Sequence, residues 1–382
     1  GPGDFIFIGC ILIAGVVSDI RRPFLRSAAE LRGFFYLVCS LVGLTLLSST
    51  INAYTWGIEG NDIIEIFRPF YYFLIVVFVA EWTRRYGTTQ LIVAFLLGIL
   101  VAGIVAYLNP AHEDYAGTNV LWNPNVIGNT LAIGVVLVSL LIFGREFAIS
   151  AGLLVPLLVL SLFTFSKGTW VMSMLGMAAC ATAAFGIEDD RRRRSVGKFA
   201  FAAVIIGIVA IGVQYFELIY DLVQLKLEAT QLGDSAVQGG STAARLGYAI
   251  ASLQLALENP LIGVGISNYE LAYNSLRDYL GDYFWETDNP HSAWLYVMAC
   301  IGFPALAVYV LMVLYPLRGL WRQIALPPLA KKTYMLCVFG ILFLSGAVVS
   351  HILTHYFMWF FTGIVAGRQC YDSQYLRVGP RS

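Results

Sequence analysis

Two cations, Lys167 and Arg245, stand where the chain does not require a charge. Lys167 interrupts two apolar segments at a turn that needs only serine and glycine. Arg245 lies in the first turn of a helix that we expect to run to about Glu258, and the free N–H groups of a first turn already favour anions. A guanidinium adds a planar fork suited to phosphate oxygens. The two residues therefore predict an anion site; the alternatives are a lysine that reaches lipid headgroups and an arginine paired with Asp234 or Glu258.

His291 and Arg68 are two further candidates. His291 ends a long polar segment just before an apolar run. An imidazole at that place could take a proton from an incoming hydroxyl at neutral pH, or it could simply bond to a neighbour at a helix start. Arg68 precedes Pro69 at the start of another apolar segment, where it either pairs with Glu65 or lines the same cavity.

The composition defines the surroundings of these residues. The 382 residues are 58% hydrophobic and 13% charged, with a mean hydropathy of +0.74. Water-soluble domains are about 45–50% apolar and about 25% charged, so a soluble enzyme is excluded. A formal net charge of zero gives no general attraction for nucleic acid. Apolar runs of roughly 16–20 residues instead predict an all-α polytopic membrane protein.

Eleven apolar runs qualify as membrane spans. They are Phe5–Ile20, Phe34–Ile51, Ile66–Ala80, Leu91–Leu108, Val126–Phe143, Ala151–Phe165, Val171–Gly186, Phe199–Phe216, Ala293–Leu317, Thr333–Ser350 and Ile352–Ala366. We expect helices 1–8 within residues 1–216, a large loop with amphipathic and capped helices at 217–290, helices 9–11 within 291–367 and a tail at 368–382. A native helix before Asp4 would give twelve spans.

The basic residues fix the expected direction of these spans. Of the 24 lysines and arginines, 19 fall in segments that alternate with acidic loops, among them Arg21–Arg32, Arg191–Lys198 and Arg318–Lys332. Such an excess is typical of cytoplasmic loops, so the loop at 217–290 faces outside, which in a bacterium is the periplasm. The remaining five are Arg68, Lys167, Lys226, Arg245 and Arg277. Ionisable groups at membrane depth are costly and tend to be functional; for Lys226 and Arg277, however, lipid headgroup contact and a solvated loop face are favoured.

No metal or cofactor is predicted. The chain contains neither a C-x-x-C nor an H-E-x-x-H pattern. His112 with Glu113 and Asp114 fits a solvated acidic loop better than a metal cluster, and His351 and His355 flank a tight turn, which indicates a structural role.

Four stretches together resemble the bacterial O-antigen ligase and O-antigen polymerase superfamily of integral-membrane, GT-C-like glycosyltransferases. They are Asn123-Pro124-Asn125, Ser166-Lys167-Gly168, Arg245 followed by Asn259–Gly265, and Asn289-Pro290-His291-Ser292. Their order and sidedness, with one large late loop, carry the resemblance from Asp4 to Gly367.

The resemblance implies a transferase in the bacterial inner membrane with an active site that faces the periplasm. Its donor would be an undecaprenyl-pyrophosphate-linked glycan, and its acceptor lipid A–core or a second lipid-linked glycan. The resemblance makes Lys167 and Arg245 pyrophosphate ligands and His291 the base, so that His291 and Arg245 are the predicted catalytic residues. Arg68 is a further candidate ligand of the pyrophosphate, and Asn125, Asn289 and Ser292 are candidate substrate contacts. The family usually has arginine at the position of Lys167 and often asparagine at that of Ser292.

Three functions stay open at this point. A ligase to lipid A–core is slightly favoured over a polymerase, because polymerases often present two basic periplasmic loops and this chain presents one. Attack opposite the leaving group would invert the anomeric carbon, and without a metal the cations must stabilise the departing pyrophosphate. A transporter or flippase for a lipid-linked solute is the alternative of another class. The unusual charges of this chain gather on one face, which favours single-sided chemistry over alternating access.

Overall fold

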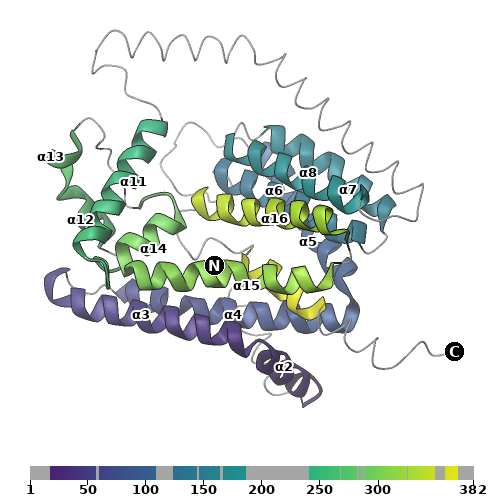
Figure 1. The fold of residues 1–382 in the computed structure, drawn as a ribbon, viewed down its shortest axis with the longest axis horizontal. Helices are drawn as coiled ribbons and strands as arrows, with labels where there is room; N and C mark the ends of the chain where they lie inside the picture. The colour runs from purple at the N-terminus through teal and green to yellow at the C-terminus, as the bar shows by residue number, and fades with distance from the viewer. Residues whose placement is uncertain are drawn as a thin grey trace, which may run out of the picture.

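The computed structural model describes residues 18–56, 60–108, 124–143, 146–163, 167–185, 241–348 and 358–368, apart from positions 267, 282, 283, 285, 286, 288 and 325. Regular structure in these ranges is helical, without strands. Figure 1 shows long helices side by side, with the shorter helices of residues 241–301 gathered at one end.

The helices follow one another with short connections where the chain is described. Their bounds are α2 Ser18–Glu30, α3 Arg32–Trp56, α4 Gly60–Tyr86, α5 Thr88–Leu108, α6 Pro124–Phe143, α7 Phe147–Phe163, α8 Lys167–Phe185, α11 Ser241–Glu258, α12 Tyr269–Asn274, α13 Arg277–Leu280, α14 Ala293–Ile301, α15 Phe303–Gln323 and α16 Pro328–Val348. A last helix covers residues 358–368.

Five of these helices, α3, α4, α5, α15 and α16, are long and apolar enough to cross a membrane. Shorter apolar helices lie within α6, α7 and α8. The predicted class, an all-α polytopic membrane protein, is therefore confirmed. Of the eleven predicted spans, Phe199–Phe216 and all but three residues of Phe5–Ile20 lie outside the described residues.

The prediction of a basic loop at Arg21–Arg32 was wrong, because most of this segment forms α2. Its charges coat a helix whose inner side docks on α4. Ser27 Oγ donates a hydrogen bond of 2.7 Å to Oε2 of Glu81, a side chain that is only 8% exposed. The same carboxylate pairs with Arg84 and, at 2.6 Å, with Nε of Arg85. A charge pattern alone could not distinguish this helix from a loop.

An aromatic core fixes the long helices to one another. The ring of Phe34 in α3 lies 5.2 Å from the ring centroid of Tyr315 in α15 and 5.6 Å from that of Trp359 in the last helix. Trp359 is fully buried and also packs on Tyr72 of α4, at 5.5 Å. These rings hold α3, α4, α15 and the last helix together as one body.

The predicted span Ala293–Leu317 is not one helix. Gly302, with a φ of 93°, separates the nine-residue α14 from the membrane-length α15. An L-residue rarely adopts this left-handed conformation, and the carbonyl carbon of Leu261 would lie 2.7 Å from a Cβ at Gly302. The break therefore depends on glycine and on a segment forty residues earlier in the chain, which the hydropathy of the run does not reveal.

Candidate functional site

His291 lies in a tight turn directly before α14. Its φ is 51°, and among the described residues His291 is the one non-glycine residue whose φ is positive. The turn is stabilised by the side chain of Asn289, whose Oδ1 accepts a hydrogen bond of 2.9 Å from the backbone N–H of His291. This is the Asx-turn geometry that asparagine favours. Asn289 and Ser292 are buried on either side, whereas His291 is exposed.

An aromatic side chain connects His291 to α11. The ring of Tyr248, which is 7% exposed, lies 5.6 Å from the imidazole centroid of His291. Tyr248 in turn packs edge-to-face on Tyr273 of α12, at 5.8 Å, and Tyr273 stacks on Phe284, at 5.1 Å. Aromatic pairs of this kind restrict the orientation of each ring. The imidazole is thus placed against a packed aromatic cluster.

Arg245 occupies the same part of α11. It is exposed and lies three residues before Tyr248, which puts the two side chains on neighbouring positions of the helix surface. Through Tyr248, the structure brings the helix that carries Arg245 against His291. Pairing with Glu258 is excluded, because thirteen helical residues span about 20 Å and Glu258 instead accepts a hydrogen bond of 2.7 Å from Gln254. Asp234 lies outside the described residues.

The segment Asn259–Gly265, predicted as a turn at the membrane surface, forms a double cap. The N–H groups of Val264 and Gly265 donate to the carbonyls of Ala299 and Cys300 at 3.0 and 2.8 Å, which satisfies the last turn of α14. Its Pro260 carbonyl accepts a bond of 2.9 Å from Phe303 N–H, at the start of α15. A single turn therefore caps two consecutive helices.

Polar side chains of α3 complete this cap. Ser48 Oγ donates to the carbonyl of Cys300 at 2.9 Å, and Asn52 Nδ2 donates to the carbonyl of Gly263 at 3.2 Å. Sequence analysis did not single out either residue, since a lone serine or asparagine in an apolar helix shows no partner until the fold is known. Their hydrogen bonds fix the carboxyl end of α14, and thereby the position of His291 at its other end.

The backbones of Lys167 and Asn125 lie at the same end of the bundle as His291. Trp294 of α14 donates from Nε1 to the carbonyl of Phe343 in α16, at 2.9 Å. Near the same end of α16, Ser345 Oγ accepts a bond of 3.1 Å from Asn129 of α6.

The α6 and α8 helices then meet at a close crossing. A Cβ at Gly128 would lie 1.8 Å from Oγ1 of Thr169, so the first turns of the two helices are adjacent. Lys167 is the first residue of α8 and Asn125 the second of α6. The structure describes their backbones only, and their predicted contacts with a substrate stay predictions.

Two other predicted cations have protein partners. An Nη atom of Arg68 lies 2.6 Å from a carboxylate oxygen of Glu65, one turn earlier in α4. Arg277, predicted to be a solvated loop residue, is exposed but lies 4.6 Å above the ring of Phe284. Lys226 lies outside the described residues. The pair with Glu65 supports a structural role for Arg68, and its part in pyrophosphate binding remains a prediction.

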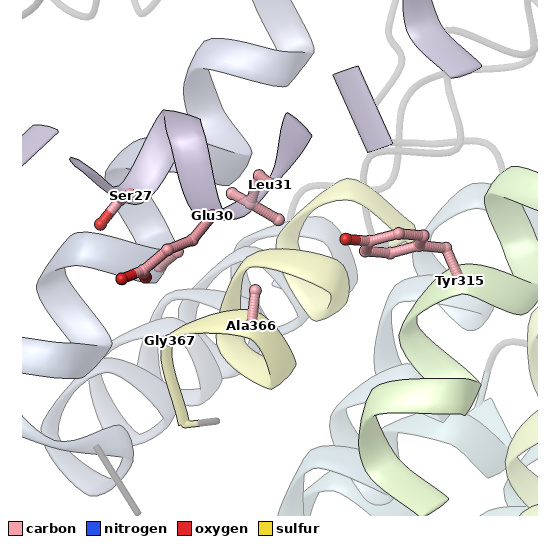
Figure 2. A pocket seen from close by; sticks show the side chains of 7 residues that line it. Ser27, Glu30, Leu31, Tyr315, Ala366 and Gly367 are labelled. Carbon is pink, nitrogen blue, oxygen red and sulfur yellow. The ribbon is translucent and has the colours of Figure 1, made fainter. Parts of the chain in front are cut away.

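A separate pocket lies at the opposite end of the bundle. It is lined by Ser27 and Glu30 of α2 and by Leu31 just after it, together with Tyr315 of α15 and Gly367 of the last helix. Figure 2 shows Tyr315 facing Leu31 and Ala366 across this hollow. It contains none of the predicted site residues, and it adjoins α2 and the last turn of α4, where Arg84 and Arg85 lie.

In the described ranges, no group of three or more His, Cys, Asp or Glu side chains is placed so that it could hold a metal ion. The predicted cluster at His112, Glu113 and Asp114, and the pair His351 and His355, lie outside these ranges.

The fold defines a polytopic membrane protein in which the helix that carries Arg245 contacts His291 through Tyr248. Residues 152–310 match the family model described as O-antigen ligase. This part of the chain contains Lys167, Arg245 and His291, and the match confirms the predicted resemblance to the O-antigen ligase and polymerase superfamily. The match supports an enzyme of the O-antigen ligase and polymerase type, a membrane glycosyltransferase-like class whose substrates are in general lipid-linked glycans. No match is found among curated proteins.

Proposed function

We propose that the protein transfers a glycan from an undecaprenyl-pyrophosphate donor to an acceptor hydroxyl at the periplasmic face of the bacterial inner membrane. The observation that carries this proposal is the contact of Tyr248 with His291, which places the α11 helix of Arg245 beside the imidazole. A cation and a base side by side are the two groups that release of a diphosphate and activation of a hydroxyl require.

Arg245 acts on the leaving group. As the bond between the anomeric carbon and the diphosphate oxygen breaks, the electron pair goes to that oxygen and negative charge develops there. The guanidinium can donate two parallel hydrogen bonds to phosphate oxygens. The N–H groups of the first turn of α11 support the same charge. Lys167, at the first residue of α8, is proposed as the second cation and Arg68 as a third.

His291 acts on the acceptor. The acceptor oxygen forms its bond to the anomeric carbon on the face opposite the diphosphate, and its proton passes to the imidazole. The glycan is transferred with inversion, and undecaprenyl pyrophosphate is released without a metal or cofactor. Asn125, Asn289 and Ser292 are proposed to help bind the sugars. The left-handed backbone of His291 supports a functional role, because such strained residues cluster at active sites.

We favour lipid A–core as the acceptor over a second lipid-linked glycan, the substrate of a polymerase, because the sequence presents one large outer loop. A flippase is disfavoured by the same sidedness. Arg84 and Arg85 end α4, and Arg322, Lys331 and Lys332 lie where α15 ends and α16 begins, at the far end of α15 from α14, whereas Arg245 lies on the helix that contacts His291. Alternating access would need charged groups accessible from both sides.

The test is reconstitution in lipid bilayers with a lipid-linked glycan donor and, in parallel, lipid A–core or a second lipid-linked unit as acceptor. We expect His291→Ala to lower kcat by about 10²–10⁴-fold, the usual contribution of a general base. Arg245→Ala should abolish most activity and Arg245→Lys should restore part of it. Gln254→Ala, on the same helix but remote from His291, is the matched control. Full activity in the His291 and Arg245 variants, or retention at the anomeric carbon, would refute the mechanism.

A further inference from the structure

The α11 helix carries a row of exposed leucines that no part of the proposed reaction uses. Leu246, Leu253 and Leu257 are 50%, 47% and 59% exposed, and Leu261, just past the helix, is 69% exposed. Steps of seven and four residues place them along one side of a helix. The opposite side, with Tyr248, Ser252 and Leu255, is buried. The side of α11 that faces away from the protein therefore carries a row of apolar residues.

Polar residues border this row on both sides. Gln254 and Glu258, joined by a hydrogen bond of 2.7 Å, lie along one edge. Arg245 lies on the other edge, about 100° around the helix from Leu246. An apolar row between charged borders is typical of helices that lie in a membrane interface, with cations at the level of lipid phosphates.

The leucine row continues into the lipid-facing surface of a spanning helix. Leu261 follows Pro260, whose carbonyl is hydrogen-bonded to Phe303 N–H at the start of α15. Phe303, Val310 and Leu314 are exposed along one face of α15, the surface that a membrane-spanning helix presents to lipid chains. Figure 1 shows α11 running across the end of the bundle, at a steep angle to α15. The helix is thus oriented to lie along a bilayer that α15 crosses.

We infer that α11 is an interfacial helix whose leucine row inserts among the phospholipid chains of the leaflet nearest to it. The row lies on the surface of a single helix, which suits bulk lipid chains. This insertion holds Arg245 at the depth of the phosphate groups, where the diphosphate of a lipid-linked molecule would also lie. The inference concerns lipid contact alone and does not depend on the transfer reaction.

Site-specific photo-crosslinking tests the inference in the full chain. A diazirine amino acid replaces Leu253 or Leu257 in protein held in nanodiscs of phosphatidylethanolamine and phosphatidylglycerol, and intact mass spectrometry measures phospholipid adducts. The same label at Leu314 of α15 is the lipid-exposed reference, and at Glu258 the polar-edge control. Because only exposed side chains are replaced, each labelled protein should fold.

We expect adduct yields at Leu253 and Leu257 to fall within about twofold of Leu314 and to exceed Glu258 by about fivefold or more. Yields as low as those of Glu258 would show that the row faces water, and crosslinks to the chain's own peptides would show that protein covers it. Either result overturns the inference. Loss of the phospholipid adducts on addition of undecaprenyl diphosphate would also overturn it, by assigning the row to the tail of a single bound lipid.

Discussion

Replacement of Gly263 by alanine should separate the turn at residues 259–265 from α14. A Cβ at Gly263 would lie 2.3 Å from the carbonyl carbon of Cys300 and 2.5 Å from the carbonyl oxygen of Ala299, both backbone atoms. The φ of 61° adds about 1–2 kcal/mol for any L-residue. The turn must also move, which weakens two backbone hydrogen bonds worth about 0.5–1.5 kcal/mol each. We therefore expect Gly263→Ala to destabilise the protein by about 2–5 kcal/mol.

Gly281 provides the matched control. Its φ of 51° is also positive, but nothing lies within 4 Å of the position of a Cβ. Gly281→Ala should therefore cost only the backbone term, about 1–3 kcal/mol. Thermal unfolding in detergent, followed by tryptophan fluorescence, compares the two variants, and transfer activity is measured well below both midpoints. Equal midpoints for the two variants would refute the close contact between the turn and α14.

Three other variants test the surroundings of His291 and the opposite end of the bundle. Tyr248→Leu should lower kcat about tenfold or more by releasing the imidazole, with Tyr248→Phe near wild type because the ring is kept, as steady-state transfer rates would show. Asn289→Ala should lower kcat, whereas Asn289→Asp, which keeps the acceptor oxygen, should recover it. Equal rates in these two variants would exclude loss of the turn's hydrogen bond as the cause. Glu81→Ala should lower the unfolding free energy by about 3–5 kcal/mol, since it leaves buried arginine charge unpaired, against less than about 0.5 kcal/mol for Glu30→Ala, whose ion pair is exposed; similar unfolding midpoints would contradict this.

The spanning helices could be predicted from sequence because hydrocarbon imposes one length and one composition on each of them. The break at Gly302 could not, since an apolar run with one glycine reads the same whether straight or interrupted. What opens the run is a set of backbone hydrogen bonds to Pro260, Val264 and Gly265, and these exist only in the folded chain. For the same reason the charge pattern does not predict α2 as a helix: its docking partner, Glu81, lies more than fifty residues away.

The charge pattern and the expected sidedness of the loops predict two residues of the candidate site. Arg245 and His291 attract notice because each stands where the topology does not require it, and Tyr248 connects the helix of Arg245 to His291. Tyr248 was missed, because an aromatic residue in an apolar helix has no distinguishing pattern; its spacing of three residues from Arg245 was the available clue. The ion pair of Arg68 with Glu65 was one of two alternatives that sequence left open, and the structure contains it.

The length of the short helix α14 determines where His291 lies. Its carboxyl end is held by the turn at 259–265 and by α3, so its nine residues, about 13 Å long, separate that anchor from the turn that contains His291. Shortening the helix by one residue would withdraw His291 by about 1.5 Å and swing it about 100° around the axis, away from Tyr248. The number of residues in α14, independently of their chemical nature, thus sets both the distance of His291 from the anchored end of the helix and its direction around the helix axis.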